Sequence, residues 1–331
     1  MLLNAEAQPY PNNGIGSKTT GLEALIKTGR LKMASAQPLK TLADVNKNKP
    51  ISFPKKMPSK ISGEKKAVPQ KVSNTSTGAE LWGVIIYRDS WKDLDDWSKP
   101  YGIYGTKAGE TTFTSFVEDP YYLNMNGCGA FFDDKFHGIS YSEYDGVIYY
   151  LTYMEYETEN WTQTDNSWQY IYDSSLAAYA TAYSSTDGKV YAYMRGNEGA
   201  MNFGTIDYSS LTTSVISEAD RVYVAMSADA EGNIYAIGLD GNLYSISKQT
   251  GESTLIGTTG VTPSSVLQSA TIDQNSGIMY WAAINSDNTS SLYQVDTTSG
   301  AASKINDFAD NEEIVCLYAP VSANPLAPSP A

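Results

Sequence analysis

The stretch that decides the fold is Ala225-Met-Ser-Ala-Asp-Ala-Glu-Gly-Asn-Ile-Tyr-Ala-Ile-Gly-Leu-Asp-Gly-Asn-Leu-Tyr-Ser-Ile-Ser-Lys-Gln-Thr-Gly251. It contains three short alternating apolar runs, which favour β-strands. The first run ends at the turn sequence Ala230-Glu-Gly232, and the second ends at Asp240-Gly241, a strong hairpin signal. Residues 254–256 add a fourth run. Four strands in about forty residues is the size of one blade of a β-propeller.

The same unit recurs along the chain. A Gly-x-apolar-Tyr motif ends at Tyr149, Tyr191, Tyr235 and Tyr280, so its spacings are 42, 44 and 45 residues. A strand of small residues precedes each motif, and a strand with an aromatic residue follows. Small residues suit a crowded first strand near a central axis, whereas aromatic and β-branched residues suit the wider outer strands. The near-constant period favours a propeller over the alternative, a plain β-sandwich.

The first copy of the motif fixes the strands expected in its blade. We expect the first strand at residues 138–141, the second at 146–149 and the third at 170–173, and a fourth strand is hard to place after them. The hairpin at residues 131–139 then lies before the blade. The structural alternative is therefore a ring of six blades, in which this hairpin and the irregular stretch at 173–176 form a separate blade.

Two fragments at the ends of the repeat region complete the ring. Residues 80–87 resemble a second strand with no first strand before it, and residues 313–318 resemble a first strand with nothing after it. Pairing them builds one further blade from both ends of the chain and hides sheet edges that would otherwise be open. The sequence therefore predicts an all-β, five-bladed β-propeller over residues 79–320, with four-stranded blades.

The regions outside the repeats have a different composition. Residues 1–78 contain 13 Lys and Arg against 4 Asp and Glu, a net charge of +9, whereas the remainder contains 10 against 33, a net of −23; together they give the −14 of the chain. Low hydrophobicity, many lysines and scattered prolines predict a disordered basic tail at 1–78. Residues 321–331 are rich in proline and predict a linker.

Charge and hydropathy limit the classes of partner. The tail lysines are spread out without interleaved aromatic residues, and the acidic domain repels phosphate, so we expect no nucleic-acid partner. No stretch approaches the roughly 20 apolar residues of a membrane-spanning helix, so we expect no direct membrane insertion. Few charges, an acidic balance and abundant Tyr, Thr, Ser and Asn favour a secreted or cell-surface domain whose leader is missing from this sequence, and the alternative is a cytosolic protein. We expect a monomer.

The residues that usually carry metal or acid–base chemistry are few. His137 is the only histidine and lies in an alternating run after a predicted Asp133-Asp134 turn, so we expect a buried strand histidine. With Cys128 and Cys316 it cannot make a zinc site of three or four ligands. We expect the two cysteines to be free and buried, and the alternative for an exported chain is a disulfide between them. The acidic run at residues 93–96 lacks the glycine and glutamate of an EF-hand loop. No metal, cofactor or catalytic residue is predicted.

Aromatic residues gather in the longest loops. Residues 88–100 and 155–167 are expected to join second and third strands of neighbouring blades, with the connection 118–126 between them, so all three should share one face of the ring. We predict a ligand-binding surface there, because aromatic rings beside Asp and Asn side chains commonly hold sugars or extended peptides. The alternative is that these rings pack between the blades. The candidate residues are Trp91, Trp97, Trp161, Trp168, Tyr121 and Tyr122.

Several motifs resemble a known group of proteins. They are Asn126-Gly-Cys-Gly-Ala-Phe-Phe-Asp-Asp-Lys-Phe-His-Gly-Ile-Ser-Tyr141, the tyrosine-rich run at 146–156 and the Leu-Tyr-x-apolar-Asp-x-x-x-Gly strands. They look like the β-propeller ectodomains of bacterial cell-surface proteins that are described as adhesins. The resemblance covers residues 79–320 and implies the fold and a cell-surface location. Its motifs are structural, so no functional residues carry over.

Three functions follow as hypotheses. The favoured one is a non-catalytic binding or adhesion module that recognises a glycan or protein at the cell surface through the aromatic face. The alternatives are a structural spacer and a glycan-active hydrolase or lyase. The acidic residues of the domain are too many for the sequence to select a catalytic pair.

Overall fold

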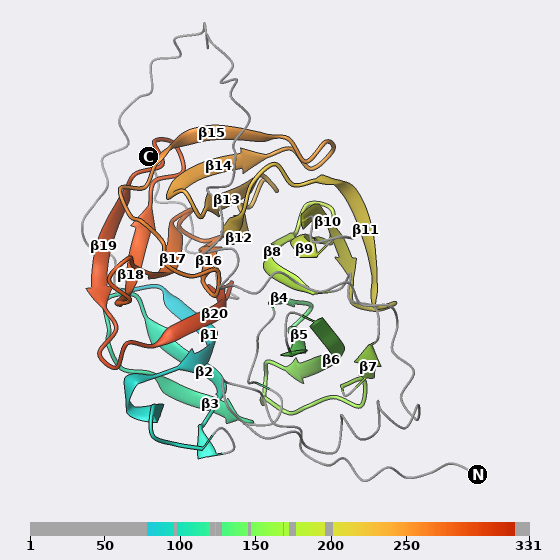
Figure 1. Cartoon of the computed structure of the whole chain (residues 1–331), viewed down its shortest axis with the longest axis vertical. Helices are drawn as coiled ribbons and strands as arrows, with labels where there is room; N and C mark the ends of the chain where they lie inside the picture. The colour runs from blue at the N-terminus through green and yellow to red at the C-terminus, as the bar shows by residue number, and fades with distance from the viewer. Residues whose placement is uncertain are drawn as a thin grey trace, which may run out of the picture.

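Five antiparallel β-sheets of four strands each form a ring (Figure 1). The computed structural model describes residues 78–95, 98–119, 123, 128–144, 147–167, 169–171, 177–195 and 201–321. The tail predicted at 1–78 and the linker predicted at 321–331 lie outside these residues, apart from Gly78 and Val321. The five-bladed ring confirms the predicted fold class, and the six-bladed alternative is wrong.

The strands of each blade are given from the innermost to the outermost. Blade one contains β20 (Glu313–Tyr318), β1 (Glu80–Tyr87), β2 (Gly102–Lys107) and β3 (Thr114–Glu118), with the short 3-10 helix η1 (Asp89–Trp91) after β1. Blade two contains β4 (Gly129–Phe132), β5 (Lys135–Tyr144), β6 (Val147–Glu157) and β7 (Gln169–Ile171). Blade three contains β8 (Ala178–Ser184), β9 (Lys189–Arg195), β10 (Met201–Asp207) and β11 (Thr212–Glu218). Blade four contains β12 (Tyr223–Ala228), β13 (Ile234–Gly238), β14 (Asn242–Ile246) and β15 (Ser253–Thr258). Blade five contains β16 (Ser269–Ile272), β17 (Met279–Ile284), β18 (Ser290–Val295) and β19 (Ala302–Asp307).

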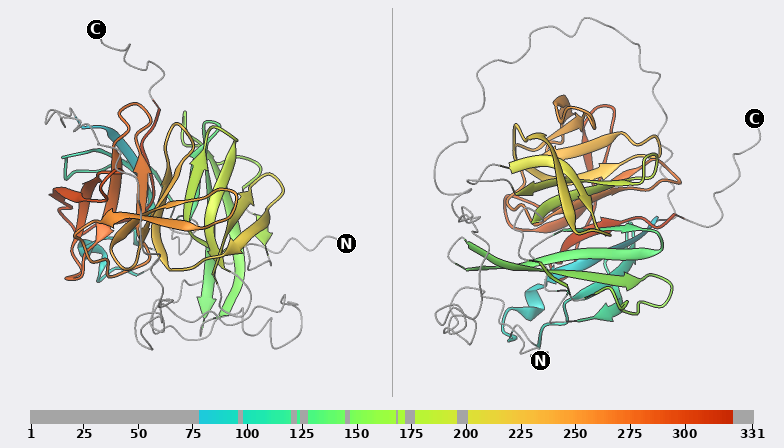
Figure 2. Two further views of the ribbon diagram at one scale, coloured as in Figure 1. Left: turned by 90° about the horizontal axis from the view of Figure 1, so that it is seen from above. Right: turned by 90° about the vertical axis from the view of Figure 1, so that its right-hand side faces the viewer.

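The strand at the end of the repeat region closes the ring. β20 pairs antiparallel with β1, with Trp82 opposite Tyr318 and Val84 opposite Val315. Figures 1 and 2 show β20, in red, beside the cyan strands of blade one. A bulge interrupts the pairing, and Cys316 at this point has the left-handed φ of 57°. The closure by residues 313–318 is as predicted.

Blade two differs from the prediction by one strand. The Gly-x-apolar-Tyr copy that ends at Tyr149 falls at the start of the third strand, β6, whereas the copies at Tyr191, Tyr235 and Tyr280 lie on second strands. The hairpin at residues 131–139 supplies β4 and the start of β5, so it is the inner half of this blade. Its turn, Asp133-Asp134, is confirmed, because both residues have the left-handed φ of a type I′ hairpin.

The shift in blade two changes which loops share a face. We call face A the side with the loops from first to second and from third to fourth strands, and face B the other side. The loop at 88–101 joins the second and third strands of blade one and lies on face B. The loop that begins after β6, described at residues 158–167, leads from the third to the fourth strand of blade two and lies on face A. The prediction that these loops share a face is therefore wrong.

The core lies within and between the blades. The inner strands β12 and β16 are buried along their whole length, whereas the outer strand β15 exposes most of its residues at least partly. Trp281, Tyr223, Phe136 and Phe203 are among the largest fully buried side chains. Each such side chain contributes roughly 1.5–3 kcal/mol by its burial. Within the described ranges, no helix has the length and apolar character that crossing a bilayer requires.

Candidate ligand-binding site

A groove between blades two and three opens on face A and has a volume of about 1040 Å³. Its walls come from β4, β5 and β6 on one side and from β9 and β10 on the other, with one lysine from blade four. A cavity of this size suits a small-molecule or carbohydrate ligand. The lining residues that matter below are Lys135, His137, Glu155, Asp187, Tyr208 and Lys248.

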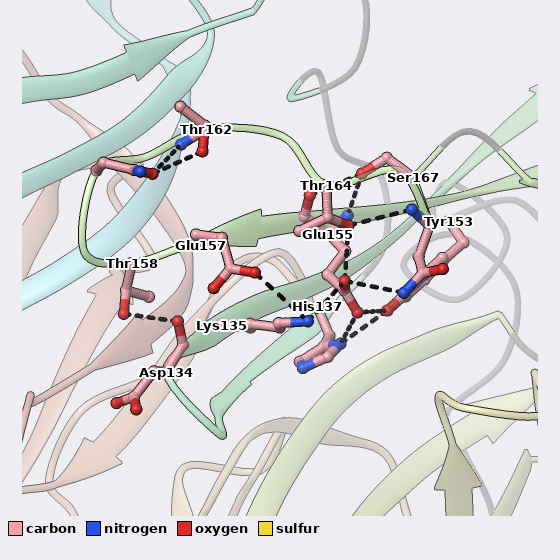
Figure 3. Close-up of polar contacts among 12 residues, drawn as sticks. Asp134, Lys135, His137, Tyr153, Glu155, Glu157, Thr158, Thr162, Thr164 and Ser167 are labelled. Carbon is pink, nitrogen blue, oxygen red and sulfur yellow. Dashed lines mark hydrogen bonds and ion pairs between the residues drawn. The ribbon is translucent and has the colours of Figure 1, made fainter.

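The polar residues of the groove are brought together by the pairing of β5 with β6. His137 lies opposite Glu155, and Lys135 lies opposite Glu157. Successive residues of a strand point to opposite faces of the sheet, so 135 and 137 share one face with 153, 155 and 157. Figure 3 shows Lys135, His137 and Tyr153 grouped around the carboxylate of Glu155. The cluster therefore follows from strand register.

A chain of hydrogen bonds fixes the tautomer of His137. The hydroxyl of Tyr153 donates to Oε2 of Glu155 at 2.8 Å, since a carboxylate only accepts. That hydroxyl has one proton, so its oxygen accepts from Nδ1 of His137, also at 2.8 Å. The neutral imidazole therefore carries its proton on Nδ1 and leaves a lone pair on Nε2. Burial lowers the pKa of His137 to about 4, which keeps the ring neutral at pH 7.

Glu155 is ionised although it is only 5 % exposed. Burial opposes its ionisation, but hydrogen bonds from Thr164, Tyr153 and Lys135 outweigh burial and lower the pKa of Glu155 to about 2. Thr164 Oγ1 donates to Oε1 at 2.6 Å, and Lys135 Nζ lies 3.1 Å from the same oxygen. The backbone around Glu155 is fixed as well, because its N–H donates to Oγ of Ser167 and its carbonyl accepts from that hydroxyl. This carboxylate is a fixed structural charge.

Two buried polar atoms at the groove have no partner. Nε2 of His137 and the hydroxyl of Tyr208 accept or donate no hydrogen bond among the described residues. Their side chains are only 6 % and 5 % exposed, and both line the groove. An unpaired buried polar group costs about 1–3 kcal/mol. The half-buried ring of Phe132 covers the imidazole, with 4.0 Å between ring centroids and an angle of 15°.

Two aspartates of blade three complete the groove and are held in place. Asp187 accepts from the hydroxyl of Tyr191 at 2.8 Å and pairs with Lys248 at 3.2 Å. Burial opposes the ionisation of Asp187, but these contacts lower its pKa. Asp207 accepts from the hydroxyl and N–H of Ser209, which lowers its pKa. Both carboxylates are thus ionised and already bonded. Within the described ranges, no group of three or more His, Cys, Asp or Glu side chains is placed to hold a metal ion.

The predicted aromatic surface is only partly described. Trp97, Trp168, Tyr121 and Tyr122 lie outside the described residues. Trp91 is on face B, where it is 4 % exposed and packs edge-on against Tyr101, with the guanidinium of Arg88 over its ring. Trp161 is half-buried on face A. The structure therefore does not bring these two tryptophans together.

Trp161 packs at the junction of blades one and two. Its ring stacks on Phe116 with centroids 4.7 Å apart and meets Trp82 edge-on at 5.1 Å. Its backbone has the left-handed φ of 56°, which is uncommon for a bulky residue. These contacts join the loop after β6 to β1 and β3.

Sequence reasoning missed the groove but not all of its parts. His137 is buried in a strand, as predicted. Cys128 and Cys316 are free and buried, also as predicted. The alternation Lys135-x-His137 and Tyr153-x-Glu155-x-Glu157 indicates two polar faces, and antiparallel pairing of these segments would have joined them. The one-strand shift in blade two concealed that pairing.

The sequence and the fold were compared with those of known proteins. No model of a known family matches the sequence. No curated protein matches it either. TolB from Acinetobacter baumannii is similar in structure with a TM-score of 0.44 and 10 % identity, over 69 % of this chain and 53 % of TolB. A structural-genomics protein from Bacteroides thetaiotaomicron has a TM-score of 0.41 and 14 % identity, over 69 % of this chain and 57 % of that one.

A puromycin-hydrolyzing peptidase from Mycobacterium tuberculosis has a TM-score of 0.37 and 11 % identity, over 63 % of this chain and 33 % of the peptidase. The chain thus spans little more than half the length of the first two structures. At these scores the similarities carry no argument about what this chain binds. The propeller is established by the strand topology of the chain itself.

Proposed function

We propose that the chain is a non-catalytic binding module of the bacterial cell surface that recognises a glycan in the groove between blades two and three. The observation that carries this proposal is the pair of unpartnered buried atoms at the groove, the acceptor Nε2 of His137 and the donor hydroxyl of Tyr208. A sugar hydroxyl both donates and accepts, so a polyhydroxylated ligand can satisfy both atoms. Their unpaired state is then a cost that ligand binding removes.

The apolar lining supports the same ligand. The half-buried ring of Phe132 supplies flat apolar surface beside polar groups, which is the usual composition of a carbohydrate site. Both unpartnered atoms are buried. Phe132, which is half-buried over His137, is the side chain that would have to shift for a ligand to reach them. We place the glycan here and not on the aromatic loops of the sequence-based prediction, because Trp91 and Trp161 lie on opposite faces.

The electrostatics favour binding over hydrolysis. Glycoside hydrolysis uses two carboxyl groups, of which one has a raised pKa and donates a proton. In the groove, Glu155, Asp187 and Asp207 have lowered pKa values and are already hydrogen-bonded. The carboxyl group of Glu313, whose pKa burial and Asp89 raise to about 7, lies in blade one, away from the groove.

Two matched variants test the proposal on a glycan microarray. Tyr208→Phe removes only the unpartnered hydroxyl. His137→Asn places an amide donor near the position of Nδ1, so the bond to Tyr153 is kept while Nε2 is lost. We expect each variant to weaken retention of the bound glycan roughly tenfold, equivalent to about 1.4 kcal/mol.

The control is Leu255→Ala, at a half-exposed position of β15 in blade four. It should leave glycan retention unchanged. Retention by both groove variants at the level of the unmodified protein would refute the groove as the site. Selective capture of a protein or peptide in place of any glycan would refute the ligand class.

A further inference from the structure

A second cavity adjoins the groove on face A. It occupies the mouth of the central channel, has a volume of about 480 Å³ and is lined by the inner strands of all five blades. The β4–β5 turn, residues 132–135, stands between the two cavities. Phe132, Asp133 and Lys135 line both of them. The two cavities therefore meet at one turn.

Aromatic rings continue across this turn. On the channel side, Phe132 stacks on Tyr183 with ring centroids 5.0 Å apart. On the groove side, the same phenylalanine stacks on His137 at 4.0 Å. Tyr183 lines the channel mouth and His137 lines the groove. A ligand that crosses the turn would meet the half-buried rings of Phe132 and Tyr183, which offer apolar surface to the faces of sugar rings.

The turn is a firm rim. Asp133 and Asp134 have φ values of 52° and 57°, which aspartate tolerates better than most residues. Thr158 donates two hydrogen bonds, from its N–H and its hydroxyl, to the carbonyl of Asp134, both at 2.9 Å. The rim is thus tied to the end of β6 and presents its two carboxylates to solvent. No described residue donates a hydrogen bond to the Asp133 carboxylate.

We infer that the ligand is a linear, uncharged or amino-sugar oligosaccharide that crosses the β4–β5 turn, with some of its units in the groove and others in the mouth of the channel. This rests on the proposed function. The exposed carboxylate of Asp133 lies where the two cavities meet and can accept hydrogen bonds from sugar hydroxyls. The groove lining holds four carboxylates, of Asp133, Glu155, Asp187 and Asp207, against the three lysines Lys135, Lys189 and Lys248. Together with the 33 acidic against 10 basic residues beyond position 78, this net negative charge disfavours sulfated or uronic-acid chains.

The test compares chain lengths and charges. The unmodified protein is applied to an array of linear neutral, amino-sugar and uronate oligosaccharides, each from one to six units. We expect affinity to rise with chain length in the neutral or amino-sugar series, and the uronate series to stay unbound. Equal affinity for one unit and for six would overturn the crossing while leaving glycan binding in the groove intact. Stronger retention of uronates would overturn the ligand class, and no retention of any glycan would overturn the proposed function as well.

Two variants locate the crossing. Tyr183→Ala removes aromatic surface from the channel side only, so it should weaken binding of the longest glycan about tenfold and leave the shortest unchanged. Asp133→Asn keeps the shape of the rim and a hydrogen-bond acceptor but removes the charge, so it should admit uronates. Leu255→Ala again serves as the control. An unchanged length dependence in Tyr183→Ala would overturn the channel-side contact. Continued exclusion of uronates by Asp133→Asn would overturn the role of its charge.

Discussion

Blades two and four are built from the same number of strands but handle their polar groups differently. In blade four the strands have five or six residues, and its turn at residues 229–233 is fixed by hydrogen bonds from Asn233 to Asp229. In blade two, β5 and β6 have 10 and 11 residues, and β7 has three. The long strands carry a buried polar cluster that includes an unpartnered atom. Blade four thus satisfies its buried polar groups with nearby partners. Blade two borders the groove and leaves Nε2 of His137 without a hydrogen bond.

The largest effect should come from removing the strand that closes the ring. Deleting residues 313–321 removes the buried side chains of Ile314, Val315 and Leu317, each worth roughly 1.5–3 kcal/mol, from a blade with no other inner strand. This loss approaches the typical 5–15 kcal/mol of domain stability, so we expect no cooperative thermal transition. Deleting residues 323–331 is the control. A cooperative thermal transition in the chain that lacks residues 313–321 would contradict the closure of the ring by β20.

Replacing a buried tryptophan by alanine should lower the free energy of unfolding more than replacing a partly exposed one. Trp281 in blade five is fully buried and donates to Gln268, so Trp281→Ala should destabilise by about 3–5 kcal/mol. Trp91→Ala should cost nearly as much, since its ring is buried under Arg88. Trp161→Ala should cost less, because its ring is partly exposed. Chemical denaturation measures all three, and equal losses would remove this distinction.

The pH dependence of stability should separate blade one from blade two. Burial and Asp89 raise the folded pKa of Glu313 to about 7, above its ordinary 4.5. The contribution of Glu313 to the free energy of unfolding, up to about 3 kcal/mol, is therefore complete below pH 4.5 and is lost as pH rises through 7. His137 has the opposite sign, because its lowered pKa of about 4 makes stability fall as pH drops from 6.5 toward 4.

Matched variants test these two signs by denaturation at several pH values. The two slopes oppose one another between about pH 4.5 and 6.5, where both groups titrate. Glu313→Gln should therefore make stability rise more steeply with pH in this window and should remove the loss between pH 6.5 and 7. His137→Asn should make stability fall more steeply between pH 4.5 and 7. A wild-type slope near pH 7 in Glu313→Gln would show that another group titrates there.

The smallest expected change in stability comes from removing single tyrosine hydroxyls. The hydroxyl of Tyr244 in blade four donates to Asp240 at 2.6 Å, so Tyr244→Phe should destabilise by about 1 kcal/mol. The hydroxyl of Tyr208 in blade three has no described partner, so Tyr208→Phe should be neutral or should stabilise by about 1 kcal/mol. Opposite shifts in Tm would confirm that the hydroxyl is bonded in Tyr244 of blade four and unpartnered in Tyr208 at the groove. Equal destabilisation would indicate that the Tyr208 hydroxyl is bonded.

These contrasts also show what could be predicted from sequence. The ring of five and its closure follow from the period and from two incomplete ends at residues 80–87 and 313–318. The prediction for blade two is wrong by one strand because the motif ending at Tyr149 occurs on its third strand, and spacing alone does not say which strand carries a motif. The groove could not be predicted, because His137 and Tyr208 come together only when two blades pack. Burial of Trp91 depends likewise on contacts with Arg88 and Tyr101 that no local pattern encodes.

The direction of the closing strand has a mechanical consequence. Trp82, near the start of β1, lies opposite Tyr318 at the end of β20, so the two strand ends leading out of the ring sit side by side. Tension applied between residues 79 and 320 would peel this antiparallel pair apart from one end, one pair of hydrogen bonds at a time. Shear along the strands would instead have loaded all these bonds at once. A domain closed in this way unfolds at low force when it is stretched along the line between its ends.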